Sequence, residues 1–493
     1  MAAAQWSDSG RRVLLGPDGR PVRRGAVSFP ASALAAHYDV SHTTSQNAEH
    51  WSFAVGGDAN IAFNYENRRK ARRRARYETS NNPHLRGMVE TKASDTVGDG
   101  PNLQMLSPDG QEIEVAWKSW ADEIRLTEKL LTLWAAGKQI DGEGIGLLYD
   151  DGAVRHEVKL NLQLIESEQM GNPFAEMDSE HIYDGVYHSA SQPSAYYIYD
   201  EHPEAYAYPV LPTYTGKWYE ASRVIHTFRH YRIGQLRGAT ELGPALPFAA
   251  ILRRFTLATL DAAEIAAQIS LWLETDATPD EGPQTYSDGA FTQMPTTRNM
   301  LITAPYGWHA KQIKSEQPID TYESFVRVVV TQMGKSIGMP AALSYGDSSS
   351  YNMASGRLDF QTYIRGIETD RRAHLETDVL EKIFFLWMQF YAASRSGISP
   401  SSIDAEYLAK AYPHRWAYRP ILHSDPEKQS AADVNLYQAG LLTMDQYLYR
   451  HNIDPESHYE QLKRQAQRLA DIGMPAPGMM PGMPTGGQSN DEQ

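Results

Sequence analysis

The stretch ALPFAAILRRFTLATLDAAEIAAQISLWL, residues 245 to 273, decides the fold, and TYESFVRVVVTQMGKSI, residues 321 to 337, belongs with it. The first stretch contains no glycine and four charged residues, and it predicts a helix about 40 Å long at 1.5 Å per residue. Its apolar positions spread around much of the helix, which therefore needs neighbours on more than one side. The second stretch predicts a helix that ends at Gly338-Met339-Pro340.

The interval between these helices, residues 274 to 317, has a different composition. It is rich in Pro, Gly, Thr and Ser, and its first half is acidic. We expect a small, exposed and partly β module there. Its acidic residues are Glu274, Asp276, Asp280, Glu281 and Asp288.

The chain after the second helix predicts a loop and then a very long helix. Residues 341 to 353 contain a Gly-Asp-Ser-Ser-Ser run, which favours a flexible loop. From Ala354 to about Ala393 there is no proline, so a helix of about 60 Å is predicted. Shorter helical pieces follow at 431 to 439 and 455 to 469, and the Pro/Gly/Met tail from Gly473 is expected to be disordered.

The first half of the chain predicts an α+β unit after a loosely ordered arm. Residues 82 to 104 run from a helical into a strand-like pattern, and residues 117 to 136 predict one amphipathic helix. Short apolar runs separated by turn residues then predict strands. These runs are Ile145 to Leu148, Leu162 to Ile165, Ala195 to Tyr199 and Val224 to Phe228.

A basic cluster lies just before this unit, where seven of nine positions are Lys or Arg. Two interpretations stay open: a contact with phosphate or a partner protein, or a solvated helix face beside an acidic neighbour. The cluster consists of Arg68, Arg69, Lys70, Arg72, Arg73, Arg74 and Arg76.

Composition excludes several classes of function. The 493 residues include no cysteine, which removes disulfides, thiolate nucleophiles and cysteine-ligated metal sites. No signal-peptide core or long apolar run occurs, so neither secretion nor membrane insertion is expected. A net charge of -15 argues against a protein that coats nucleic acid, because binding phosphate needs a surplus of cations. The same charge is compatible with a conduit for DNA, because each tight contact with phosphate would impede movement of the duplex.

Motifs for chemistry are weak in this sequence. Gly334-Lys335-Ser336 resembles the end of a phosphate-binding loop, but Val329 stands where that loop needs glycine, and the context is helical. Residues 142 to 146, GEGIG, resemble the turn of a dinucleotide-binding site, but Leu147 stands where the third glycine of that motif is needed. We therefore predict a plain turn that leads into a strand. His226 and His230 lie in a predicted strand, so their spacing of four does not predict paired ligands. We therefore predict no catalytic residue, metal or cofactor.

The order of these pieces resembles the lambda-type portal family of tailed bacteriophages. The similarity runs from about residue 60 to 395, and it rests on local phrases that occur collinearly. These are NPHLRG (82 to 87) with VGDGPNLQ (97 to 104), LIE (164 to 166), AYYIY (195 to 199), VIH (224 to 226) with QLRG (235 to 238), and YNMAS (351 to 355).

The resemblance implies a portal fold, an α+β ring subunit with wing, stem, clip and crown regions and long helices around an axial channel. The corresponding regions follow the chain in order. They are an arm (1 to 60), the wing (61 to 244), stem helix 1 (245 to 273), the clip (274 to 317), stem helix 2 (318 to 338), the tunnel loop (339 to 353), a long wing and crown helix (354 to 395), a helical crown (396 to 472) and the tail (473 to 493).

The resemblance also implies partners: a homo-oligomeric ring, usually of twelve subunits, with double-stranded DNA in its channel, in a virion assembled in the host cytoplasm. The clip would dock the terminase large subunit and later the head-tail adaptor, while major capsid and scaffolding proteins would contact other faces. Lys335 and Arg357 are possible channel charges. The residues expected to line the channel are Tyr345, Ser348, Ser349, Ser350, Tyr351 and Asn352.

Two other classes remain as alternatives. A nucleic-acid-processing enzyme would need Asp and Glu side chains that converge around a metal ion. Another virion structural protein, such as an adaptor or a tail component, would lack two helices that carry the 274 to 317 insertion.

Overall fold

The computed structural model describes most of the chain. Two compact units result, Met1–Gly57 and Asp58–Gln493. In the first, strand β1 (Ala4–Trp6) pairs antiparallel with β2 (Arg12–Leu14). The described residues are 4–6, 12–14, 49, 54, 56–107, 110–179, 181–189, 192–204, 214–268, 272–275, 308–311, 321–349, 352–404, 407–408, 411–418, 426–451 and 453–473.

The second unit begins with helices α2 (Ala59–Ala62), α3 (Tyr65–Asn81) and α4 (Pro83–Val97). Asn82 ends α3 and begins α4, because its side-chain oxygen accepts hydrogen bonds from the backbone N–H groups of His84 and Leu85. Proline at the first position of α4 leaves no N–H unsatisfied there. The helix predicted after Asn82 and the strand that follows it, β3 (Asn102–Met105), are confirmed.

The single helix predicted over residues 117 to 136 is wrong. The structure has α5 (Gln111–Glu123), α6 (Leu126–Thr132) and a π-helix, η2 (Leu133–Asp141). The break lies at Arg125, whose φ of 54° is left-handed and cannot continue a helix. The apolar pattern nevertheless continues across the break, because both helices bury the same side against one core.

Strands were predicted correctly at all four positions, but they belong to two antiparallel sheets. The first sheet has the order β10-β4-β5, from β4 (Glu143–Asp150), β5 (Leu160–Ile165) and β10 (Val224–Phe228). The second has the order β6-β7-β8-β9, from β6 (Ile182–Tyr183), β7 (Val186–Ser189), β8 (Gln192–Tyr199) and β9 (Gly216–Glu220). Short 3-10 turns join them: η3 (Ser167–Gln169), η4 (Pro173–Ala175) and η5 (Ala221–Arg223).

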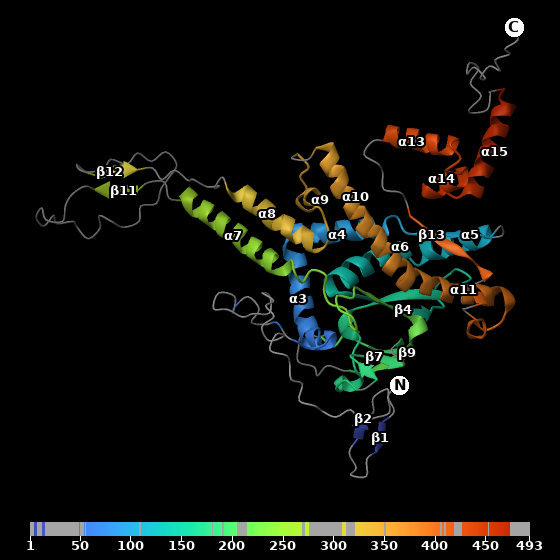
Figure 1. Cartoon of the computed structure of the whole chain (residues 1–493), viewed down its shortest axis with the longest axis horizontal. Coiled ribbons are helices and arrows are strands. Elements are labelled where there is room, and N and C mark those ends of the chain that lie inside the picture. The colour runs from blue at the N-terminus through green and yellow to red at the C-terminus, as the bar shows by residue number, and fades with distance from the viewer. Residues whose placement is uncertain are drawn as a thin grey trace, which may run out of the picture. The chain divides into compact units, whose positions relative to one another are not determined.

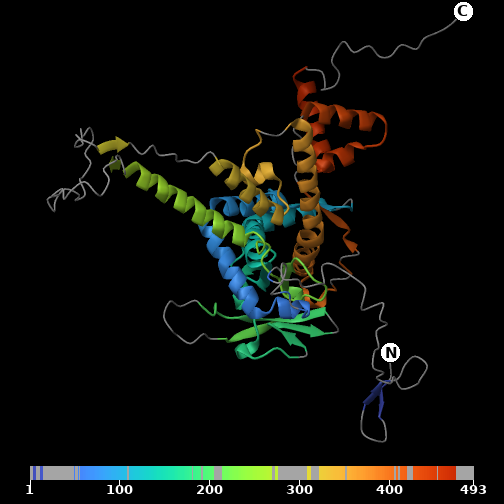
Figure 2. The same ribbon diagram turned by 60° about the vertical axis from the view of Figure 1, so that its left-hand side comes forward.

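Helices α7 (Leu246–Gln268) and α8 (Thr321–Ser336) lie side by side (Figures 1 and 2). Phe255 joins them, with its ring 5.6 Å from Tyr322 and 4.6 Å from Phe325. The prediction that the first helix reaches Leu273 is wrong; the helix is described as far as Gln268. Trp272–Thr275 instead forms β11, whose backbone pairs with β12 (Trp308–Lys311).

The long helix predicted from Ala354 to Ala393 is confirmed. It consists of α10 (Met353–Asp370), a π-helical segment η6 (Arg371–Leu380) and α11 (Glu381–Ser396), with helical dihedral angles at both junctions. Gly397 ends it in a left-handed conformation, with φ of 69°. A π-helix has hydrogen bonds between residues five apart instead of four, and a segment of this length is uncommon.

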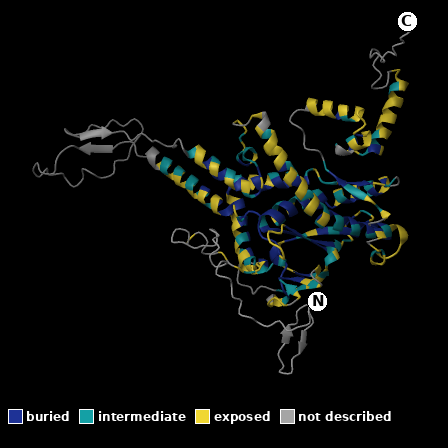
Figure 3. Cartoon of the chain, viewed as in Figure 1, coloured by how far each residue is buried: buried dark blue, intermediate teal, exposed yellow. Residues whose placement is uncertain are grey.

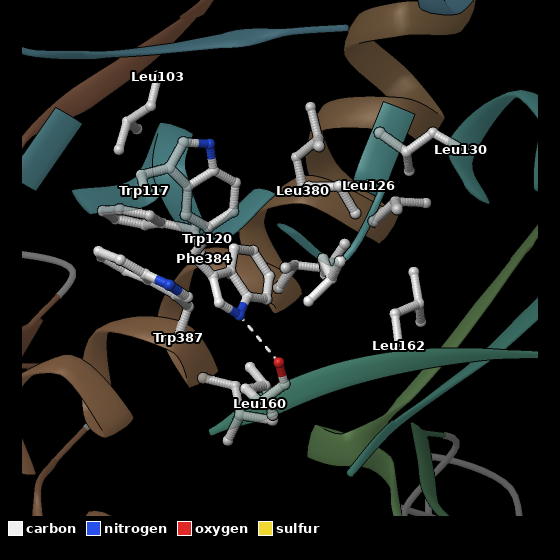
Figure 4. Packing of buried hydrophobic residues seen from close by; sticks show 14 of the residues in the cluster. Leu103, Trp117, Trp120, Leu126, Leu130, Leu160, Leu162, Leu380, Phe384 and Trp387 are labelled. Atoms are coloured by element: carbon white, nitrogen blue, oxygen red, sulfur yellow. Dashed lines mark hydrogen bonds between the residues drawn. The ribbon is translucent and has the colours of Figure 1, made fainter. Parts of the chain in front are cut away.

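Buried residues gather around η2, β4 and α11 (Figure 3). Trp120 is at the centre: its ring is 5.1 Å from Trp117 and 6.1 Å from Trp387, and its Nε1 donates to the carbonyl of Leu160 at 2.9 Å (Figure 4). Truncating a buried Trp typically costs about 3–5 kcal/mol. This core therefore fixes α11 and the first sheet firmly in place.

The remaining chain returns to this core and then forms further helices. After η7 (Pro400–Ser402), strand β13 (His414–Ala417) pairs antiparallel with β3. Helices α13 (Pro426–Gln438), α14 (Met444–Arg450) and α15 (Pro455–Asp471) follow, in agreement with the predicted helical pieces. No helix among the described residues has the length and hydropathy to span a bilayer.

Candidate channel segment and charged clusters

The segment predicted as a loop from Ala341 to Met353 begins with a helix, α9 (Ala341–Tyr345). Pro340 precedes its first residue, and Gly346 ends it with φ of 78°, so the sequence does carry start and stop signals. The helix packs tightly on α8, because a Cβ at Gly334 would lie 2.4 Å from that of Ser344. The prediction of a loop is wrong for these five residues.

Tyr345 lies half-buried between two neighbours rather than free at the surface. Its ring stacks on His84 at 6.3 Å, and the Arg327 guanidinium lies 5.5 Å from its centroid. Arg327 also binds Asp347 at 3.0 Å. The backbone N–H of Ser349 donates to Asp347, and this bond, with the nearby Arg327 charge, lowers the pKa of Asp347. The residues around Tyr345 are thus held by α4 and α8.

The polar residues after α9 are the exposed part of this segment. Ser348 and Ser349 are exposed, and Asn352 caps α10 by accepting a hydrogen bond from the Ser355 N–H at 2.8 Å. Ser350 and Tyr351 lie outside the described residues. The name channel segment is used below for residues 341 to 352.

The two predicted channel charges lie on either side of the channel segment. Lys335 is exposed in the last turn of α8, and Arg357 is exposed near the start of α10. A cation in the last turn of a helix is favoured by the helix dipole. Gly334-Lys335-Ser336 is part of α8, as predicted, so its N–H groups are not arranged as a phosphate cradle.

The predicted acidic clip residues are only partly within the described residues. Glu274 lies in β11, where its backbone pairs with His309 of β12. Asp276, Asp280, Glu281 and Asp288 lie outside the described residues.

The basic cluster occupies α3, and the helix sorts its members by face. Arg68, Arg72 and Arg76 are four residues apart and point inward; the side chains of Arg68 and Arg72 are 2% exposed. The hypothesis of a solvated helix face is therefore wrong for these two residues. Its second half, an acidic neighbour, is confirmed by the carboxylates described next.

Glu143 is the carboxylate at the centre of this inward face. Arg237 binds both of its oxygens, at 2.7 and 2.9 Å, and the Gly238 N–H and His226 Nε2 lie at 3.0 and 3.1 Å. Arg68 and Arg72 are each 3.6 Å away. Burial would raise the pKa of Glu143, but Arg237, His226 and Arg68 hold it well below its ordinary value. Glu143 is therefore ionised in the interior.

Three further carboxylates complete this network. Glu168 binds Arg72 at 3.2 Å and Arg76 at 2.9 Å, and Asp141 accepts two hydrogen bonds from Arg76. Asp184 binds Arg68 and Arg237. Four arginines thus face four carboxylates, and the name arginine network is used for this set. It consists of Arg68, Arg72, Arg76 and Arg237 with Asp141, Glu143, Glu168 and Asp184.

The rest of the basic cluster faces outward. Arg69 and Arg73 both bind Glu204, and Arg73 is half-exposed. Lys70 and Arg74 are exposed. The predicted contact with phosphate or a partner protein stays a prediction, and these outward residues are the ones that can make it.

A second buried charge cluster was not found from the sequence. Lys138, which is fully buried, binds Glu241 at 2.7 Å and Asp370 at 2.9 Å, and Lys92 binds Glu241 at 3.0 Å. Burial would raise the pKa of Glu241, but the two lysines lower it to about 2. This cluster connects α4, η2 and the turn that precedes α7 to the end of α10. No local motif marks it, because its members are more than forty residues apart in sequence.

The histidines and acidic groups near the second sheet offer little for chemistry. His226 is buried and its pKa is lowered, because burial outweighs its bond to Glu143. Ligand atoms of Glu166, Glu168 and His202 lie within 4.8 Å of one another. However, Arg76 already binds both glutamates, and its positive charge opposes a metal ion there.

Comparison with known proteins identifies a family. The model described as phage portal protein, lambda family, matches residues 45–371. A solved chain from the neck of an empty GTA particle, computed with C6 symmetry, is 13% identical with a TM-score of 0.42, covering 80% of this chain and 91% of that chain. No curated protein matches this chain.

Two other solved chains have the same identity of 13% and TM-score of 0.42. One is from the virion of a native gene transfer agent (GTA) particle, with coverage of 86% of this chain and 95% of that chain. The other is from the neck of a native GTA particle computed with C12 symmetry, with coverage of 81% and 92%.

The family match covers well over half of the 493 residues. It includes α3, both sheets, α7, α8, the channel segment and α10, and it ends at the first residue of η6. The resemblance stated from the collinear phrases is confirmed. The chain belongs to the lambda family of phage portal proteins, and it is a portal protein, a structural component of the virion.

Proposed function

We propose that copies of this portal protein close head-to-tail into a ring, usually of twelve subunits in such portals, at one capsid vertex. The observation that carries the proposal is the surface of α7 and α8. Although the two helices pack on each other, both keep large apolar side chains in solvent. They are Ile251 (53% exposed), Leu257 (52%) and Leu260 (61%) on α7, and Phe325 (40%) and Val328 (57%) on α8.

Exposed apolar residues on paired helices are explained by a ring. In a cyclic assembly each subunit presents one face to the preceding copy and a different face to the next. Burying apolar area contributes roughly 25 cal/mol per Å². Closure of the ring would therefore cover both helices, which a monomer leaves in water.

The ring would serve as the conduit for double-stranded DNA during packaging and ejection. We assign the channel contact to the channel segment, with Ser348, Ser349 and Asn352 as small polar groups and Lys335 and Arg357 as isolated cations. An acidic chain with few cations near the duplex holds phosphate weakly, so DNA can move. The mechanism is mechanical, and the motor that hydrolyses ATP would be a separate terminase.

The other regions would dock partners. We assign the stem to α7 and α8, the clip to residues 274 to 317, the wing to residues 61 to 244 and the crown to residues 396 to 472. The clip would bind the terminase large subunit and later the head-tail adaptor. The outward cations of α3, Lys70, Arg73 and Arg74, suit an acidic face of a capsid or scaffolding protein.

Negative-stain electron microscopy with mass photometry tests the ring. Wild-type protein should give rings with an axial hole and about a dozen copies, while Leu260→Glu should give monomers, because a charge in the subunit contact would be desolvated. Asp261→Asn, the next residue on α7, is the matched control and should still form rings. Wild-type monomers at every salt concentration would contradict the proposed ring.

A further inference from the structure

The C-terminal helices α13, α14 and α15 bury too little apolar surface to be stable by themselves. They occupy residues 426 to 471, beyond the family match. Among their described side chains, the large apolar residues that are fully buried are Leu442 at 3% and Leu448 at 2% exposed. Each contributes about 1.5–3 kcal/mol. Fixing the backbone of one residue costs about 1–2 kcal/mol, so three ordered helices need further burial.

Two sets of exposed apolar residues are available for that burial, on α13 and α15, whose ribbons are mostly coloured as exposed (Figure 3). The α13 row consists of Val434 (52% exposed) and Tyr437 (51%), and Leu441 (74%) lies just beyond the end of this helix. The α15 row consists of Tyr459 (41%), Leu462 (43%), Ala466 and Leu469. The α15 row advances by steps of three and four residues, and the two α13 residues are three apart, which is the spacing of a helix face that packs along another helix.

The α15 row is held in position by its own chain. The Tyr459 hydroxyl donates to Asp445 of α14 at 2.6 Å, and the Asp454 side chain caps α15 through the Ser457 N–H. The hydrogen bond to the Asp445 carboxylate raises the pKa of Tyr459 to about 12. The hydroxyl therefore keeps its proton, and with it this hydrogen bond, at neutral pH. The row is therefore presented on an ordered helix.

We propose that the α13 row of one copy packs against the α15 row of the next copy in the ring. A head-to-tail contact needs two different surfaces on each subunit, and the two rows lie on different helices. Each contact then supplies the burial that the unit lacks, so that the C-terminal helices are stabilised by assembly. This inference rests on the proposed ring, and it adds a contact outside the region matched by the family.

The absence of cysteine from the chain allows a direct test by disulfide cross-linking in assembled full-length protein. Val434→Cys and Leu462→Cys are made as separate proteins, mixed in denaturant and assembled together. Oxidation should give cross-linked dimers in the mixture and none in either protein alone. The double variant should give a ladder of cross-linked species that reaches the full ring.

A matched control uses polar, exposed positions on the same helices. Lys428 and Arg464 lie outside both rows. A mixture of Lys428→Cys and Arg464→Cys should therefore give less than a tenth of the cross-linked product that Val434→Cys and Leu462→Cys give. Two results overturn the inference. One is a double variant that cross-links only within monomers, and the other is a single variant that forms dimers alone, which would mean that identical rows meet.

Electron microscopy of the same samples separates this inference from the proposed ring. Rings in which the mixture gives no cross-link would refute the contact between the rows and leave the proposed function in place. Samples without rings would refute the proposed function itself. Tyr437→Ser gives an independent measurement, because it should raise hydrogen exchange of α15 in the assembled ring by at least tenfold and leave α11 unchanged.

Discussion

Replacing Glu143 with Gln perturbs the arginine network at the residue that most of its members touch. Glutamine has the shape of glutamate but no charge. Glu143 is 1% exposed and lies within 3.6 Å of three arginines. In the wild type the four arginines and four carboxylates of the network balance. The variant leaves one positive charge in excess where water cannot reach it.

The expected magnitude follows from that excess charge. Removing one partner of a buried ion pair typically costs about 3–5 kcal/mol, because the remaining charge stays desolvated. Arg68 and Arg237 keep Asp184 and Arg72 keeps Glu168, so the cost should not exceed that range. We therefore expect Glu143→Gln to lower the free energy of unfolding by about 3–4 kcal/mol.

Urea denaturation at pH 7, followed by tryptophan fluorescence at one protein concentration, measures this free energy. The matched control is Glu90→Gln, which removes an exposed pair with Arg86 at 2.8 Å and should cost about 0.3–0.5 kcal/mol. The double variant Glu143→Gln, Arg237→Gln restores the balance of charge, so it should cost less than the two single variants added together. Additive costs, or a Glu143→Gln cost no larger than that of the control, would refute this account of the network.

Two further predictions concern the second charge cluster and the long helix. The pKa of Glu241 is about 2, below its ordinary value of 4.5, so its contribution to stability is complete above pH 4.5 and is lost as the pH falls toward 2. The urea midpoints of wild type and Glu241→Gln should therefore differ at pH 7 and converge only near pH 2, and convergence already at pH 5 would contradict the lowered pKa. Gly366 lies inside α10 beside a cavity of about 170 Å³ and has nothing within 4 Å of an added Cβ, so Gly366→Ala should raise the free energy of unfolding by about 1 kcal/mol in the same assay. Gly334→Ala is the control with the opposite sign, because its Cβ would collide with Ser344, and equal effects of the two changes would be evidence against this packing.

Helices of the fold were predictable because their signals are local. Residues 321 to 337 and 354 to 393 have apolar periodicity with no internal proline, and both are helical in the structure. The end of α7 was predicted wrongly, because β11 gains backbone partners from β12, more than thirty residues later. The pairing of β3 with β13 across about three hundred residues has no local signal either. Register between distant strands is decided by the assembled core.

In the channel segment too, some features follow from local sequence and others depend on contacts with distant residues. Its position between two helices follows from the sequence, but its composition predicts a loop where α9 forms, although Pro340 and Gly346 mark the two ends of that helix. Tyr345, which we expect near the channel, stacks on His84, which lies more than two hundred residues earlier. Chain order located the segment, and tertiary contacts decided which of its side chains remain exposed.

The arginine network did have a signal in the sequence, because spacing by four separates Arg68, Arg72 and Arg76 from Lys70 and Arg74 on a helix. Its eight charged groups cancel inside the protein, so the net charge of -15 belongs to the rest of the chain. Three of the seven basic residues in the cluster therefore stabilise the fold, and the outward cations are a local exception on an acidic protein. Within this cluster the outward cations, such as Lys70 and Arg74, are the ones placed to bind phosphate or an acidic partner, and that contact stays a prediction.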